Sequence, residues 1–231
     1  MDWISFWDGS HAIYVSERHK QIHYARIARD LARFVPHAGA RVLDYGCGEA
    51  LAADQLAAHC GSLTLSDAAP GVRARLGARF STCAGLRILA PEEVEALPDG
   101  SFDLIVANSL LQYLPGAVLR DLLALWRRLL APGGKLLLAD VIPPDVSAMT
   151  DAMALLRFAA AEGFLPAAMA GLVRTAFSPY RKLRADLGLS HYSAPDICAR
   201  LVAAGFEPER VQPNVGHNPA RMAFLAHPAR V

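Results

Sequence analysis

The stretch from Arg41 to Ala50 holds residue types suited to binding a nucleotide. It reads R-V-L-D-Y-G-C-G-E-A, so that Asp44 ends an apolar run and Gly46 and Gly48 follow at once. Glycine lets the backbone pass close to a ligand, because a Cβ at these positions would collide with it. An Ala- and Leu-rich run, Leu51 to His59, comes next. The pattern predicts a strand, a glycine turn and a helix, which open a nucleotide-binding α/β unit.

The spacing of the glycines limits which class of nucleotide ligand the loop could bind. A dinucleotide fingerprint needs a third glycine at position 51, which is Leu51, and no G-K-[ST] phosphate loop is present. The order D-x-G-x-G instead resembles motif I of the class I S-adenosylmethionine-dependent methyltransferases, with Ala50 replacing the last glycine. The resemblance implies cofactor contacts from the motif residues Asp44, Gly46, Cys47 and Gly48. An ordinary strand-to-helix turn of another α/β protein is the alternative.

A second acid follows the next predicted strand, Ser62 to Ser66. Asp67 ends this strand about twenty residues after Gly48, the spacing of one strand–helix–strand unit. A carboxylate accepts hydrogen bonds from both adjacent hydroxyls of a ribose. The resemblance therefore implies that Asp67 holds the ribose, with Ala68 beside it. Capping of a helix ahead of Pro70 is the alternative.

Two further stretches strengthen the resemblance. Phe102 to Ala107 is an apolar run that resembles the family's F-D-x-V strand. The segment L-A-P-G-G, from Leu130 to Gly134, separates a predicted helix (Gly116 to Leu130) from a strong strand (Lys135 to Ile142). Helix, L-x-P-G-G and apolar strand recur in this order in the family.

Polar residues after the fourth strand lie where open α/β sheets bind ligands. Asn108 and Ser109 are expected at the cofactor, and Gln112 and Tyr113 at the methyl group or the acceptor, with core packing as the alternative for Tyr113. After a short third strand, Leu86 to Leu89, Glu92 is a loosely aligned candidate for the adenine amino group. An acid at a helix N-terminus explains Glu92 equally well.

The expected fold is α/β, a Rossmann-like, doubly wound, seven-stranded and mostly parallel sheet whose last strand is antiparallel. We expect one domain in four parts: an N-terminal helical lid (1–38), a cofactor-binding core (39–142), a helical insertion that covers the acceptor (143–194) and a C-terminal part (195–231). The last part is expected to hold a helix from Ser193 to Gly205 and strands at Glu207 to Gln212 and Arg221 to Ala226.

The lid and the insertion supply the remaining binding candidates. An irregular aromatic segment precedes a helix from Ser16 to Val35, and Tyr14, Arg18 and His19 lie where a lid begins. Arg18 could pair with the cofactor carboxylate, or lie on a solvated helix face. The insertion should form two or three helices. Its Met- and Phe-rich face suits an apolar or aromatic acceptor, a dimer contact or plain core.

Composition excludes several classes of function. The 231 residues are 53% apolar, and 23 Lys and Arg balance 22 Asp and Glu, which argues against a broad nucleic-acid footprint. No apolar stretch is long enough for a membrane span. The scattered cysteines Cys47, Cys60, Cys83 and Cys198 predict reduced thiols, a cytoplasmic location and no metal site. The oligomer is expected to be a monomer or a homodimer.

Methyl transfer from a sulfonium is an in-line displacement, so the protein aligns the acceptor and excludes water. A general base is needed only if the acceptor arrives protonated. The base candidates in this sequence are His191 and His19, followed by His11, His23 and His217, with Tyr14 and Tyr192 as positioning groups. Among these, His191, Tyr14 and His19 are the first catalytic candidates. The sequence thus predicts S-adenosylmethionine-dependent methyl transfer to a small molecule. A non-catalytic cofactor-binding or assembly protein and, less favoured, a nicotinamide-dependent oxidoreductase are the alternatives.

Overall fold

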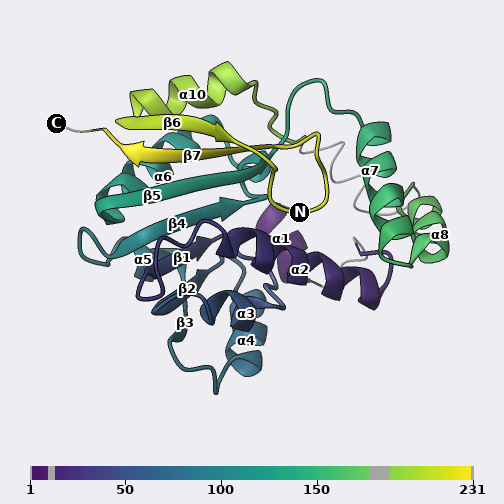
Figure 1. The fold of residues 1–231 in the computed structure, drawn as a ribbon, viewed down its shortest axis with the longest axis horizontal. Helices are drawn as coiled ribbons and strands as arrows, with labels where there is room; N and C mark the ends of the chain where they lie inside the picture. The colour runs from purple at the N-terminus through teal and green to yellow at the C-terminus, as the bar shows by residue number, and fades with distance from the viewer. Residues whose placement is uncertain (1, 10–13, 177–187, 230–231) are drawn as a thin grey trace.

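A computed structural model describes residues 2–9, 14–176 and 188–229 (Figure 1). In this part of the chain, seven strands form one sheet in the order β3-β2-β1-β4-β5-β7-β6. The strands are β1 (Arg41–Tyr45), β2 (Ser62–Ser66), β3 (Leu86–Leu89), β4 (Phe102–Asn108), β5 (Leu130–Val141), β6 (Phe206–Val211) and β7 (Met222–Pro228).

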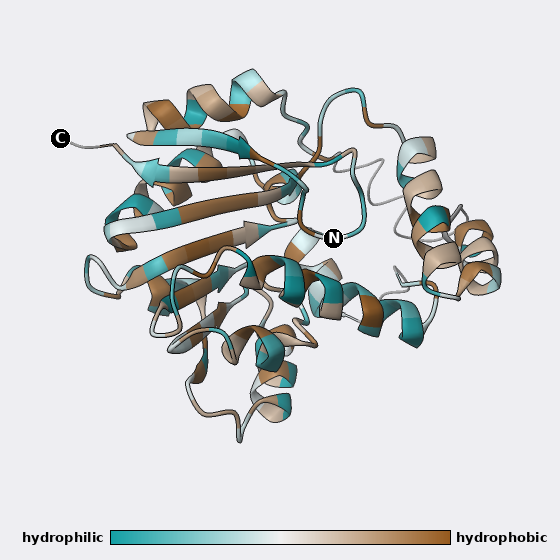
Figure 2. Cartoon of the chain, viewed as in Figure 1, coloured by the Kyte–Doolittle hydropathy of each residue, from teal (hydrophilic) through white to brown (hydrophobic). Residues whose placement is uncertain are grey.

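Six of the described strands, β1 to β6, run in the same direction, and β7 inserts antiparallel between β5 and β6. Neighbouring residues of each central strand point to opposite faces, so a strand buried on both sides must be apolar throughout. Figure 2 shows brown stretches along the central strands, whereas the helices carry both teal and brown residues. The predicted seven-stranded Rossmann-like fold is confirmed.

Helices cover both faces of the sheet. One core unites α2 (Glu17–Ala32), α3 (Ala53–Ala57) and α4 (Pro70–Arg79) with strand residues such as Val42 and Leu65. The other core unites α5 (Pro91–Glu95), α6 (Gly116–Leu129) and α10 (Ala194–Ala203) with residues such as Leu43 and Ile105. Because β1 supplies neighbouring residues to opposite cores, Asp44 and the loop after it are fixed from both sides.

The predicted helix caps are present. The Ser16 hydroxyl accepts a hydrogen bond from the His19 amide and starts α2. Ser193 and Asp196 bond each other's backbone amides at the start of α10, which is a capping box. Both helices therefore begin within one residue of where the sequence places them.

Two predicted element boundaries were wrong. The helix expected from Leu51 to His59 is only α3, because Ala50 adopts a φ of +35° and the chain turns once more before the helix starts. The L-A-P-G-G segment was expected as a turn. It instead belongs to β5, with a shift in register against β4 between Phe102 and Leu104.

The aromatic N-terminal segment was expected to be irregular, but it contains a helix, α1 (Trp3–Asp8). An Asp8 carboxylate oxygen accepts a hydrogen bond from the Gly71 amide, at the start of α4. The rings of Trp3 and Trp7 lie 4.7 and 5.8 Å from Tyr113, in the 3₁₀ turn η1 (Leu111–Tyr113) after β4. Helix α1 thus bridges the segments that follow β2 and β4, across the end of β1.

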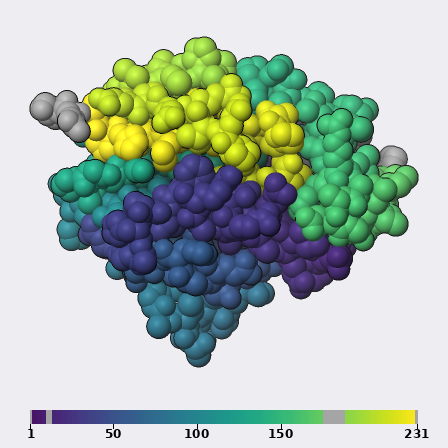
Figure 3. Space-filling model, viewed as in Figure 1, coloured from purple at the N-terminus to yellow at the C-terminus, as the bar shows by residue number. Residues whose placement is uncertain are grey.

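The insertion forms a separate lobe from α7 (Ala148–Ala161) and α8 (Leu165–Ala176), and Figures 1 and 3 show it beside the start of α2. Phe158 and Phe164 pack there with Val15 in a small apolar core. The Arg174 guanidinium donates a hydrogen bond to the Val15 carbonyl. Three further basic residues after α8, Arg181, Lys182 and Arg184, lie outside the described residues. Within the described ranges, no helix combines the length and the apolar character that crossing a membrane requires.

Candidate active site

The glycine loop follows β1 at the carboxyl edge of the sheet. Gly46 and Gly48 have φ values of +75° and +56°, which disfavour any residue with a side chain. A Cβ on Gly46 would also lie 2.8 Å from a Leu110 methyl carbon. The amides of Gly46 and Cys47 both donate to the Ser66 carbonyl, so the end of β2 holds the loop in place.

Asp67 points at this loop, as the sequence predicts. One carboxylate oxygen accepts a hydrogen bond from the Gly48 amide and the other from the Ala69 amide, each at 2.9 Å. Every carboxylate oxygen can accept a second hydrogen bond, so both retain capacity for a ligand hydroxyl. Burial raises the pKa of Asp67. Because Ala69 is the N-cap residue of α4, the hydrogen bond from its amide shows that Asp67 also fulfils part of the alternative prediction, a role at the start of this helix.

Asp44 lies buried below the loop. Its Oδ1 atom has no hydrogen-bond partner among the described residues, and the same holds for Oδ1 of Asn108 at the end of β4. Burial, together with the neighbouring carboxylate of Asp67, raises the pKa of Asp44 to about 7. A cavity of about 40 Å³ is lined by Asp44, Cys47, Asn108 and Tyr24, among others. It has room for a few water molecules.

Two residues of α2 that sequence reasoning did not assign to the site reach the loop. Lys20 forms an ion pair with Glu49, between the glycines and α3. The Tyr24 hydroxyl lies 3.5 Å from the position that a Gly48 Cβ would take, and it accepts a hydrogen bond from the Tyr14 hydroxyl at 3.0 Å. Lys20 and Tyr24 are four residues apart, so they share one face of the helix, and this spacing was the available signal.

The remaining predicted residues lie in different places. Arg18 points away from the loop and donates to the Glu162 carbonyl at the end of α7. Gln112 is buried, and its Oε1 has no partner in the described structure. His191 is exposed, whereas Tyr192 packs in the core. Glu92 lies in the first turn of α5, where an acid is favoured in any case. His11 lies outside the described residues.

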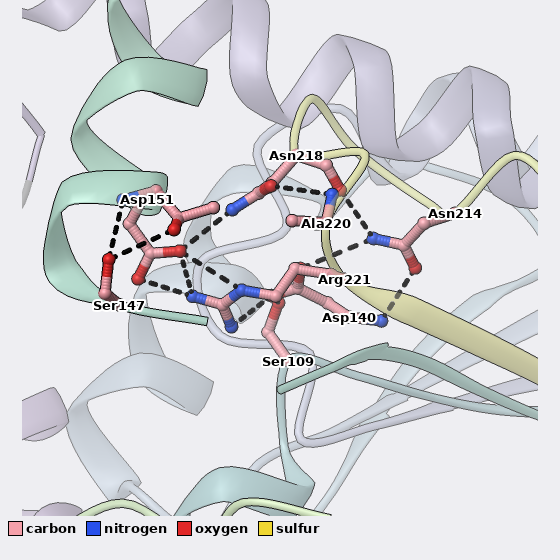
Figure 4. A network of polar contacts seen from close by, with 9 residues as sticks. Ser109, Asp140, Ser147, Asp151, Asn214, Asn218, Ala220 and Arg221 are labelled. Carbon is pink, nitrogen blue, oxygen red and sulfur yellow. Dashed lines mark hydrogen bonds and ion pairs between the residues drawn. The ribbon is translucent and has the colours of Figure 1, made fainter. Parts of the chain in front are cut away.

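A polar network joins the ends of β4 and β5 to the insertion (Figure 4). The Ser109 hydroxyl donates to Asp140 at 2.7 Å, and the Asp140 amide donates to the Asn214 side chain. Ser109 and Asp140 have φ values of +53° and +57°, a strained conformation for residues other than glycine. Strain of this kind persists only where surrounding contacts enforce it.

Arg221 completes the network. Its guanidinium donates to both Asp151 oxygens of α7 at 2.8 Å and lies 3.9 Å from Asp140. The Asn218 amide donates to Asp151 as well. Burial raises the pKa of Asp140, and Arg221 acts in the opposite direction. The loop between β6 and β7 thereby ties the insertion to the carboxyl edge of the sheet.

Three of the predicted base candidates gather beside this loop. The rings of His19 and His23, from α2, and His217, from the β6–β7 loop, have centroids 5.7 to 6.4 Å apart. His19 stacks on Phe164 at 5.0 Å, and His217 stacks on Phe158 at 4.7 Å. We call His19, His23 and His217 the histidine cluster. The sequence supplied its members but gave no indication that they meet.

The fold and the glycine loop define a methyltransferase domain. A family model described as a methyltransferase domain matches residues 17–211, and the chain belongs to this family. The match begins at the start of α2 and ends with β6, so it includes the loop, both acids and the insertion.

Relatives of known name agree with this assignment. The chain is 38% identical over 109 residues to a ubiquinone biosynthesis O-methyltransferase of Xanthomonas oryzae pv. oryzae, covering 45% of this chain and 44% of the relative. The chain thus spans under half of that relative's length. In structure it resembles the N-methyltransferase NodS from Bradyrhizobium japonicum WM9, solved with S-adenosyl-L-homocysteine. The TM-score is 0.57, with 19% identity and coverage of 96% of this chain and 94% of NodS.

A second structural neighbour is DhpI, also solved with S-adenosylhomocysteine. The TM-score is 0.63, with 15% identity, and the match covers 99% of this chain and 96% of DhpI. At such identities, these two structures establish the shared fold.

Proposed function

We propose that this protein transfers a methyl group from S-adenosylmethionine to a small-molecule acceptor. The observation that carries the proposal is the hydrogen bond from the Gly48 amide to the Asp67 carboxylate, close to Asp44, whose buried Oδ1 has no partner among the described residues. One acid with spare acceptor capacity and one acid without a partner suit a ligand that has sugar hydroxyls at one end and a cationic group at the other.

In this proposal each predicted residue has a separate role. Asp67 accepts hydrogen bonds from the ribose, with Ala68 beside it. The backbone of Gly46, Cys47 and Gly48 passes close to the cofactor. Asp44 and Asn108 offer oxygens to its amino acid end. Ser109 and Gln112 follow β4 towards the acceptor. Tyr14 acts through Tyr24, and Arg18 holds the lid rather than the cofactor carboxylate, because its guanidinium already contacts Glu162.

The chemistry asks little of the protein beyond alignment and exclusion of water. A sulfonium leaves as a neutral thioether, so its departure requires no acid, and the acceptor must lie in line with the methyl carbon. The lid (1–38) and the insertion (143–194) pack against each other, which supports their role as the cover that keeps water out.

The proposal extends to the acceptor, the location and the oligomeric state. The Phe158 and Phe164 rings favour an apolar or aromatic acceptor. Free cysteines at all four positions favour a reducing, cytoplasmic location, and the protein is proposed to be a monomer or a homodimer. The named relatives methylate both oxygen and nitrogen, so they leave the attacked atom open.

Isothermal titration calorimetry with S-adenosylhomocysteine tests the proposal. We expect saturable binding with one site per chain, and no heat with reduced nicotinamide cofactor. Binding of the nicotinamide instead would establish the oxidoreductase alternative. Binding of S-adenosylhomocysteine without turnover of any acceptor would favour the non-catalytic alternative.

A further inference from the structure

The histidine cluster packs mainly against aromatic rings. Phe158 and Phe164 lie against it from the insertion, and the Tyr14 ring lies 5.6 Å from both His19 and His23. His19 is 5% exposed, and its Nε2 atom has no hydrogen-bond partner among the described residues. A buried polar nitrogen without a partner costs free energy, so this atom requires an explanation.

The hydrogen bonding of His19 defines what that nitrogen offers. Its Nδ1 atom accepts a hydrogen bond from the Val15 amide at 3.4 Å. A neutral imidazole that accepts at Nδ1 carries its proton at Nε2. The unpartnered Nε2 atom is therefore a donor, and it suits an oxygen that can accept a hydrogen bond.

The spacing of the rings indicates what could lie between them. Two imidazoles that contact one hydroxyl oxygen through ordinary hydrogen bonds have centroids roughly 6–6.5 Å apart. Two that bind one zinc ion are closer, roughly 5 Å apart. The centroids of His19 and His217 lie 6.4 Å apart, which agrees with a shared hydroxyl.

We propose that the histidine cluster is the acceptor end of the methyl-transfer site, and that the acceptor is a hydroxyl on a planar, apolar ring. His19 donates its Nε2 proton to the acceptor oxygen, and His217 takes the proton that this oxygen loses. The inference rests on the proposed function, because it assigns the attacked atom of the same reaction.

The charge state of the cluster agrees with this assignment. Burial lowers the pKa of His19 and of His217 to about 4, and that of His23 to about 3, so all three rings are neutral near pH 7. Besides burial and His19, Arg26 of α2 and Arg221 of the loop lower the pKa of His217, and Asp151 of α7 raises it. The Tyr14 hydroxyl is protonated, since burial raises its pKa.

The chemical step balances within these groups. The acceptor oxygen forms a bond to the methyl carbon as the carbon–sulfur bond breaks, and sulfur keeps that electron pair as a neutral thioether. The hydroxyl proton moves to His217, which becomes an imidazolium and later releases the proton to water. The methylated oxygen then has no proton to donate, so product contacts the cluster more weakly than substrate.

Acceptor choice is tested with three probes that share a ring: catechol, benzylamine and benzenethiol, each with S-adenosylmethionine. We expect S-adenosylhomocysteine to form with catechol alone. H19Q and H217Q should each lower kcat about 10²- to 10⁴-fold, the range of general acid–base catalysis. The Kd for S-adenosylhomocysteine should stay unchanged in both, and this also shows that they fold. His59 is exposed and follows the end of α3, so H59Q is the matched control.

A second readout needs no turnover. With ¹⁵N-labelled histidine and S-adenosylhomocysteine present, catechol should shift the imidazole resonances of His19 and His217 and leave that of His59 in place. Methylation of the amine or the thiol, full activity of either variant, or the absence of both turnover and shifts with catechol would each overturn the inference. If S-adenosylhomocysteine nonetheless binds, the proposed function survives that outcome, whereas failure to bind it removes both.

Discussion

At the scale of single residues, the two acids of the site differ in how many of their carboxylate oxygens already have a hydrogen-bond partner. Asp67 has backbone donors on both oxygens, while Asp44 has an oxygen without a partner. A ligand therefore adds hydrogen bonds to Asp67 but supplies a missing one to Asp44. The two residues should respond differently to substitution and to pH.

Replacing Asp67 with alanine removes the proposed ribose contact and the hydrogen bond to the Gly48 amide. We expect Asp67→Ala to weaken binding of S-adenosylhomocysteine by about 1–3 kcal/mol, measured by calorimetry. Asp54→Ala, at an exposed position of α3, is the control and should bind as the wild type does. Equal affinities in Asp67→Ala and Asp54→Ala would contradict the ribose role.

Asp44 should make cofactor binding depend on pH. Its pKa is about 7, and a positively charged ligand group favours the ionised carboxylate. The Kd for S-adenosylmethionine should therefore rise as the pH falls from about 8 to about 6. Asp44→Asn cannot ionise and should flatten this dependence. A wild-type Kd that stays constant over this interval would contradict the contact.

The sequence predicted both acids but not Tyr24 or Lys20. Asp44 and Asp67 follow strands of known direction, so their meeting at one edge follows from the parallel sheet alone. Contacts of Tyr24 and Lys20 with the loop depend on the path of α2 across the sheet. Periodicity marks the apolar face of a helix but does not specify which loop that face reaches.

At the scale of elements, the insertion is held to the core by a few buried polar contacts. Arg221 lies between Asp140 of β5 and Asp151 of α7, and its side chain is 11% exposed. A buried guanidinium that loses its main carboxylate keeps the cost of its desolvation. The network should therefore contribute measurably to stability.

We expect Asp151→Asn to lower the free energy of unfolding by about 1–3 kcal/mol, because the ion pair is lost while Arg221 stays buried. Urea denaturation followed by circular dichroism measures this change. Asp121→Asn removes the exposed Arg120–Asp121 pair and should change stability by less than about 0.5 kcal/mol. Equal effects of the two substitutions would show that burial does not strengthen the network.

Predictability also differed between elements. Helix α6 was placed almost correctly, because a long amphipathic pattern identifies it within the chain itself. Helix α1 was missed, since six residues form too few internal hydrogen bonds to be stable alone. Its contacts with Gly71 and Tyr113, distant in sequence, stabilise it.

At the scale of the whole molecule, the histidine cluster couples three parts of the chain: α2, the β6–β7 loop and the insertion. Its folded-state pKa values of about 3 to 4 lie below the ordinary value of 6.5. The unfolded chain therefore binds more protons between these values. The stability linked to the cluster is complete above pH 6.5 and is lost as the pH falls toward 4.

We predict that the melting temperature of the wild type falls more steeply over this interval than that of a H23Q/H217Q variant. Asp44 and Asp140 oppose the trend, because burial raises their pKa values, so the difference between the two proteins isolates the cluster. Differential scanning calorimetry at a series of pH values measures it. Parallel curves for the two proteins would refute the coupling.

The position of α1 makes intrinsic tryptophan fluorescence a reporter of ligand binding. Two of its three tryptophans, Trp3 and Trp7, lie on this helix above the end of β1, and the third, Trp126, is fully buried behind the sheet. We expect a ligand at the neighbouring glycine loop to change the environment of these two indoles, while Trp126 supplies a constant background. Intrinsic fluorescence should therefore follow arrival and departure in real time, without a label.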